Sequence, residues 1–114
     1  MEARAVNRYI GSSPRKMRLI VDLIRGSSVE KALEVLHFSA KSASKDAEKT
    51  LRSAVSNIMN IDDSTRIDPA DLYIKDAFVN QGPTLKRISP APMGRAYRIR
   101  KRSCHLTIVV ATKG

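Results

Sequence analysis

The chain has 114 residues, 42% of them hydrophobic, with no tryptophan and only five aromatic side chains. This length suits a single domain over residues 1–114, with a core that we expect to be mostly aliphatic. No run approaches the eighteen apolar residues of a membrane span, and Cys104 has no second cysteine with which to form a disulfide. These features favour a soluble cytoplasmic protein over a membrane protein or a disulfide-stabilised secreted one.

The formal net charge is +10, and it is concentrated at the two ends of the sequence. Residues 1–18 carry five basic residues and one acidic residue, whereas residues 19–80 carry eight basic and ten acidic residues. Residues 81–114 carry eight basic residues and no acidic residue. A balanced middle flanked by strongly basic segments predicts a polyanionic partner, with nucleic acid as the leading candidate.

Residues 3–10 alternate as a short strand would, with Arg4, Val6 and Arg8 on one side. Ser13 and Pro14 then favour a helix start, because serine can cap free backbone amides and proline already holds a helical φ. Four apolar residues follow at helical spacing before Gly26 supplies a stop: Met17, Ile20, Val21 and Ile24.

Two further helices are predicted. Ser27 and Glu30 have the spacing of a capping box, and a short helix with an apolar stripe should end near His37. A longer helix is expected over residues 39–60, with many small residues on its inner face: Ala40, Ala43, Ala47, Leu51, Ala54, Val55 and Ile58. The alanines indicate close packing against a neighbouring element.

A polar connection over residues 61–70 precedes two predicted strands, at 71–79 and 105–111. The segment between them, residues 80–104, shows no pattern that could bury a core face, and it exceeds the usual length of an unstructured loop. Alternation in its second half and turn formers near its middle predict an extended β-hairpin. With arms of about nine residues, each rising ~3.3 Å, this hairpin would project roughly 30 Å.

The arms of this hairpin carry cations without carboxylates. An isolated two-stranded ribbon is marginally stable in water, and like charges weaken it further, so we expect an anionic environment around it. In an extended arm Arg98, Arg100 and Arg102 would share one face and could bind successive phosphates. With Tyr97 as its one aromatic residue, the hairpin is expected to bind structured RNA by shape and charge rather than by base stacking.

Several motifs in order along the chain resemble the L-twenty-two family of large-subunit ribosomal proteins. The first is SPRKMR followed by LIVDLIRG over residues 13–26, and the second is SAVSN at 53–57. Further matches are Gly82-Pro83, Lys86-Arg87, Gly94-Arg95-Ala96, Arg98-Ile99, Lys101-Arg102 and HLTIVV at 105–110. Each motif is weak alone, but together they cover nearly the whole chain in register.

The resemblance implies an α+β fold, with three helices packed on a small three-stranded antiparallel sheet and a long protruding β-hairpin. It also implies a structural constituent of the large ribosomal subunit that is not an enzyme, needs no cofactor or metal, binds no membrane and is not a homo-oligomer. The implied partners are large-subunit ribosomal RNA, neighbouring proteins including a loop of the L-four protein, and the nascent peptide at the hairpin tip.

The residues expected to bind ribosomal RNA lie at the N-terminal strand, the first helix and the hairpin: Arg4, Arg8, Ser13, Pro14, Arg15, Lys16, Arg18, Lys86, Arg87, Arg95, Arg98, Arg100, Lys101 and Arg102. The expected tunnel-facing tip comprises Ser89, Pro90, Ala91, Pro92, Met93, Gly94, Arg95 and Ala96. Family members commonly have basic residues where this chain has Ala91 and Met93. The tip is therefore expected to be less positive and stiffer than the tip of those family members.

Each of these features also admits another interpretation. The helix cations could form a solvated face, and the hairpin cations could belong to a disordered tail, although the strand expected at 105–111 argues against free ends. His37, His105 and the Asp62-Asp63 pair have no metal-site or catalytic partners in the sequence. Cys104 could have a lowered pKa near Arg102 but is interpreted as a strand residue. An architectural nucleic-acid-binding protein outside the ribosome and an RNA-modifying enzyme are the alternative classes.

Overall fold

The computed structural model describes residues 2–61, 69–90 and 96–112. In chain order these form β1 (Glu2–Ile10), α1 (Pro14–Ile24), α2 (Val29–His37), α3 (Ala43–Met59), a 3-10 turn η1 (Pro69–Asp71), β2 (Leu72–Gln81), β3 (Leu85–Pro90), β4 (Ala96–Lys101) and β5 (Cys104–Thr112). The order matches the predicted elements, and the α+β class is confirmed.

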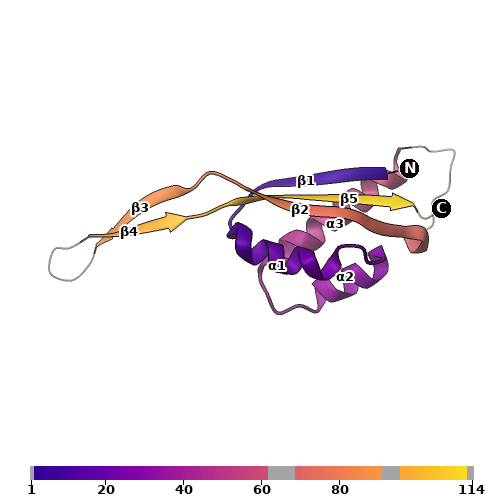
Figure 1. The fold of residues 1–114 in the computed structure, drawn as a ribbon, viewed down its shortest axis with the longest axis horizontal. Helices are drawn as coiled ribbons and strands as arrows, with labels where there is room; N and C mark the ends of the chain where they lie inside the picture. Colours follow the sequence, from indigo (N-terminus) through magenta and orange to yellow (C-terminus); the bar gives the residue numbers. More distant parts are fainter. Residues whose placement is uncertain (1, 62–68, 91–95, 113–114) are drawn as a thin grey trace.

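Three strands form an antiparallel sheet in the order β1-β5-β2, with β5 at its centre. The three helices lie together against one face of this sheet, and β3 and β4 extend away from it as a separate antiparallel pair (Figure 1). The molecule measures 66 Å along its longest axis, with a radius of gyration of 17.4 Å. A compact chain of this length would have a radius near 13 Å, so the projecting pair dominates the shape.

The core lies between the helices and the sheet and is aliphatic, as composition predicted. Helix α1 contributes the whole predicted stripe of Met17, Ile20, Val21 and Ile24, and β5 contributes Leu106, Ile108 and Val110. Helix α3 contributes the small residues Ala43, Ala47 and Ala54 together with the larger Leu51 and Ile58, and all five are buried. These short side chains let α3 pack close to its neighbours.

Two helix starts differ from their predicted positions. The cap of α2 is Ser28, whose Oγ accepts from the backbone N of Lys31 at 3.4 Å, so the Ser27–Glu30 capping box is wrong by one residue. Helix α3 begins at Ala43 rather than near 39, and Ala40 is exposed outside it. The intervening residues reverse the chain direction between α2 and α3, which a periodic pattern cannot reveal.

Groups from the helices cover both edges of the sheet. On the β2 edge, the backbone of Gly26 and Ser27 exchanges hydrogen bonds with Ile74, at 3.1 and 2.9 Å. Farther along, Arg25 donates through Nε and Nη2 to the carbonyl of Ala77, at 3.1 and 2.7 Å. On the β1 edge, Asn57 Nδ2 donates to the carbonyl of Arg4 at 3.0 Å. Exposed strand edges invite pairing with other chains, and these contacts occupy part of each edge.

The predicted hairpin appears as β3 paired antiparallel with β4, inside the expected 80–104 segment. Each strand has six residues, so the expectation of about nine residues per arm was too long. Arg102 lies one residue beyond the end of β4, so of the three arginines expected to share a strand face, Arg98 and Arg100 lie within the strand. The short segments 82–84 and 102–103 connect this pair to the sheet, and we call them the hairpin base.

Candidate nucleic-acid interface

The hairpin base is closely packed. The Gly82 backbone N donates to the carbonyl of Ser103 at 3.0 Å, and Ser103 Oγ donates to the carbonyl of Pro83 at 2.7 Å. A Cβ atom at position 82 would lie 2.5 Å from Ser103 Oγ, so the two segments approach as closely as glycine permits. The contact fixes where the hairpin leaves the sheet.

The predicted N-terminal cations are exposed. Arg4 and Arg8 lie on β1, and Arg15 and Lys16 lie in the first turn of α1. That turn carries no acidic residue, although the amide-rich end of a helix favours anions over cations. The helix end and its side chains thus combine their positive charge at one place. A phosphate group bound here would neutralise the positive charge of the helix end and that of the Arg15 and Lys16 side chains.

Ser13 and Pro14 begin α1 as predicted. Ser13 Oγ accepts from the backbone N of Lys16 at 3.4 Å, and Pro14 is buried at the first helical position. Both were also expected to contact RNA. The structure gives them the role of starting the helix that presents Arg15 and Lys16.

Arg18 has a structural partner. Its Nη2 donates to the carbonyl of Val79 on β2 at 3.2 Å, while the residue as a whole stays exposed. The sequence grouped Arg18 with Arg15 and Lys16. The fold separates them, because Arg18 also covers the sheet edge.

Cations of the hairpin arms lie opposite one another or opposite apolar residues in the β3–β4 ladder. Lys86 pairs with Arg100, Leu85 with Lys101, Arg87 with Ile99, and Ile88 with Arg98. Two like charges directly opposite each other destabilise an antiparallel pair. Bound phosphate would relieve this repulsion. Arg95 and the tip residues Ala91, Pro92, Met93 and Gly94 lie outside the described residues, while Ser89, Pro90 and Ala96 end the two strands.

Ion pairs within the described ranges neutralise charge on the helices and between β1 and β2. The pairs are Glu2–Lys75, Asp22–Arg25, Glu48–Arg52 and Glu48–His37. The hydrogen bond from Arg52 lowers the pKa of Glu48, and that from Lys75 lowers the pKa of Glu2. None of these described pairs involves Arg4, Arg8, Arg15, Lys16 or Arg102. Positive charge therefore remains available around the hairpin base.

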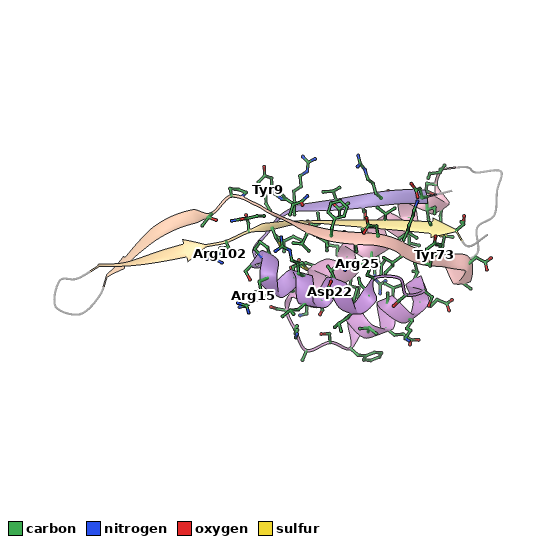
Figure 2. The ribbon with its side chains drawn as sticks, in the orientation of Figure 1. Tyr9, Arg15, Asp22, Arg25, Tyr73 and Arg102 are labelled. Atoms are coloured by element: carbon green, nitrogen blue, oxygen red, sulfur yellow. The ribbon has the colours of Figure 1, made fainter. Side chains whose placement is uncertain are left out.

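Figure 2 shows Arg15 and Arg102 at the end of the body from which the hairpin leaves, whereas Asp22, Arg25 and Tyr73 lie farther along it. Tyr9, on β1, lies at this same end. One cation from the N-terminal basic segment, Arg15, and one from the C-terminal basic segment, Arg102, thus lie at the same end of the body. The fold therefore brings basic residues from both ends of the sequence to the end of the body from which the hairpin leaves.

Sequence reasoning missed two residues near the predicted cations. Lys41 lines a cavity of about 320 Å³ together with Lys16, Leu19 and Ala43, although it belongs to the charge-balanced middle of the sequence. Tyr9 is 70% exposed and packs edge-on against His105. Lys41 gave no local signal, and the alternation of the first strand placed Tyr9 on the side of the buried Ala5, because a local pattern does not reveal the register shift between Asn7 and Ile10.

The remaining polar candidates have structural roles in the described chain. His105 Nδ1 accepts a hydrogen bond from the backbone N of Tyr9, and His37 contacts Glu48. No cluster of metal-ligating residues occurs in the described ranges, and none of their helices could cross a membrane. Burial raises the pKa of Cys104, opposite to the lowering considered from its neighbour Arg102, and its place in β5 is confirmed. Asp62 and Asp63 lie outside the described residues.

Comparison with known proteins accounts for almost the whole chain. The family model described as ribosomal protein L22p/L17e matches residues 5–111. The large ribosomal subunit protein uL22 of Chlorobium phaeobacteroides strain BS1 is 54% identical over 98% of this chain and 96% of its own length. The proteins of the same name from Chlorobaculum tepidum and Chlorobium chlorochromatii are 54% and 56% identical, each over 96% of this chain and 92% of their own length. The fold, the motifs and these matches together show that the chain belongs to the ribosomal protein L22p/L17e family.

Proposed function

We propose that this chain is a structural constituent of the large ribosomal subunit and binds large-subunit ribosomal RNA through the hairpin and the surface around its base. Support comes from the family to which the chain belongs, because the similar proteins are named as large ribosomal subunit proteins. Membership of this family also argues against an RNA-modifying enzyme. In a bacterium this role places the protein in the cytoplasm.

The observation that carries the RNA-binding proposal is the distribution of cations along the chain. Residues 81–114 have no acidic residue, and Arg15 lies at the end of the body from which the hairpin leaves (Figure 2). A ribbon with cations paired across its strands gains stability when phosphates surround it. The proposed contacts comprise Arg4, Arg8, Arg15, Lys16, Arg18, Lys86, Arg87, Arg95, Arg98, Arg100, Lys101 and Arg102, with Ser13 and Pro14 acting by starting α1.

The far end of the hairpin has a separate proposed role. Figure 1 shows β3 and β4 extending away from the body, and such a projecting pair of strands can reach between RNA helices. We infer that its tip, residues 89–96, contributes to the wall of the nascent-peptide tunnel and contacts neighbouring ribosomal proteins. Cross-linking from a photoreactive residue placed at position 93 of the intact ribosome tests this. Adducts with the nascent chain or with tunnel RNA are expected, and adducts only with external factors would contradict it.

Replacement of the hairpin arginines tests the RNA-binding proposal. We expect the triple variant Arg98→Ala, Arg100→Ala, Arg102→Ala to fold normally, because β3 and β4 are a sheet separate from the β1-β5-β2 sheet that packs on the helices. Each lost phosphate contact should lower the slope of log affinity against log salt by about one, and the tagged variant should leave large subunits at lower salt in a sucrose gradient.

A charge-matched control removes three exposed lysines from α2 and α3: Lys31→Ala, Lys45→Ala and Lys49→Ala. Both triple variants lose the same charge, so general electrostatic attraction falls equally in the two. Retention of the control with loss of the hairpin variant supports the proposal. Equal retention of both variants would contradict it, and a wild-type chain that stays at the top of the gradient would favour an architectural protein outside the ribosome.

A further inference from the structure

Tyr9 has an unusual backbone conformation. Its φ is +58°, and it is the one non-glycine residue with positive φ among residues 2–61, 69–90 and 96–112. It lies where the pairing of β1 with β5 shifts register, between Asn7 and Ile10. A left-handed conformation is costly for a bulky aromatic residue, and such irregularities often redirect a side chain. The chain therefore holds Tyr9 in a conformation that its residue type disfavours.

His105 keeps Tyr9 in this position. The Tyr9 backbone N donates to His105 Nδ1 at 3.0 Å, which requires that nitrogen to be unprotonated. The two rings meet edge to face, with centroids 5.0 Å apart and planes at 88°. Only part of the tyrosine ring is covered by this contact, since the residue remains 70% exposed. His105 thus fixes the direction of the ring without burying it.

Packing does not explain this arrangement. Tyr9 is exposed and absent from the hydrophobic core, and residues with a strained backbone are concentrated at functional sites. A single exposed aromatic residue is common on protein surfaces and would need no explanation by itself. The strain and the histidine contact together indicate that the ring is held ready for a ligand.

The surroundings of Tyr9 define the chemistry of that ligand. Arg8 precedes it on β1 and is exposed, and Arg102 lies at the same end of the body in Figure 2. An aromatic face beside unpaired guanidinium groups suits a nucleotide, whose base stacks while its phosphates bind the cations. The sheet and the hairpin base supply a rigid support.

We propose that Tyr9 is a stacking platform for an unpaired nucleobase of large-subunit RNA, with His105 as its positioning residue. This inference rests on the proposed RNA binding and deepens it. It also revises the expectation from the sequence that base stacking contributes little, because that expectation considered only Tyr97 in the hairpin. Charge supplies general affinity, and Tyr9 adds a contact to one splayed base.

The first test separates the ring from the backbone strain. Tyr9→Gly and Tyr9→Asn both tolerate positive φ, so the folded state should be as stable as wild type or more so in urea denaturation. Their affinity for deproteinised large-subunit RNA of Chlorobaculum tepidum should fall about fivefold or more, while Tyr9→Phe should retain wild-type affinity. Stacking releases no counterions, so the salt slope should not change in any of these variants. Unchanged affinity in both ring-deleted variants, or a reduced slope, would overturn the proposal.

The second test uses Tyr9→Trp. The chain contains no other tryptophan, so the emission of this variant reports on position 9 alone. Strong quenching on addition of the RNA, at wild-type affinity, supports stacking. Unquenched emission at wild-type affinity overturns the stacking proposal and leaves RNA binding standing. A wild-type chain with no affinity for the RNA overturns both proposals.

Discussion

Gly82 offers the sharpest test of how the hairpin is attached to the body. In Gly82→Ala the new Cβ would lie 2.5 Å from Ser103 Oγ, 3.2 Å from the Ser103 carbonyl carbon and 3.3 Å from His105 Cε1. The hydroxyl can rotate away, but it then loses its 2.7 Å hydrogen bond to the carbonyl of Pro83. The carbonyl carbon is backbone and must move with the strand.

The cost follows from these contacts. Loss of one exposed hydrogen bond contributes about 0.5–1 kcal/mol, and overpacking against backbone contributes about 1–3 kcal/mol. We expect Gly82→Ala to lower the free energy of unfolding by about 2 kcal/mol, measured by urea denaturation. A tilt of about 10° at the base would also move the far end of a six-residue strand, roughly 20 Å away, by about 3 Å. Incorporation into large subunits should therefore fall as well.

Two further variants control this measurement. Gly11→Ala places its Cβ in open space, with nothing within 4 Å, and should change stability by less than about 0.5 kcal/mol. Ser103→Ala removes the atom at 2.5 Å, so the double variant should be more stable than the sum of the two single effects predicts. A Gly82→Ala variant as stable as Gly11→Ala, or additive effects in the double variant, would refute the reasoning.

Three other predictions concern side chains whose roles only the fold separates. Arg25→Ala should lower the free energy of unfolding by about 1–2 kcal/mol, because two charge-assisted donors to the carbonyl of Ala77 are lost; a urea midpoint equal to that of wild type would contradict this. Arg15→Ala should weaken RNA binding and leave the free energy of unfolding unchanged, whereas Arg18→Ala should lower both the RNA affinity and the free energy of unfolding. Filter binding and urea denaturation measure the two quantities, and the reverse pattern would contradict the separate roles of Arg15 and Arg18. Cys104, fully buried with a raised pKa, should react with a thiol reagent far more slowly in the native chain than in urea; equal rates would show that the thiol is accessible.

The sequence alone determined the element order and the core stripe of α1, because both depend on local periodicity and capping. Met17, Ile20, Val21 and Ile24 repeat at helical spacing, and Ser13-Pro14 and Gly26 mark the ends of their helix. The charge distribution also indicated a polyanionic partner, because the charge of each segment can be counted directly from the sequence. The family motifs extended this reading to the fold and the hairpin.

Tertiary structure alone decided which cations are free and which hold the fold together. Arg18 and Arg25 look alike in the sequence, but their carbonyl partners lie 61 and 52 residues away. Tyr9 acquires its role through His105, 96 residues distant, and Gly82 through Ser103. Local sequence patterns carry no information about contacts between residues so far apart in the chain, because such contacts depend on how the strands pair in the sheet. The sequence therefore supplied the charge and the helices, and the fold brought basic residues from both ends of the sequence to one end of the body.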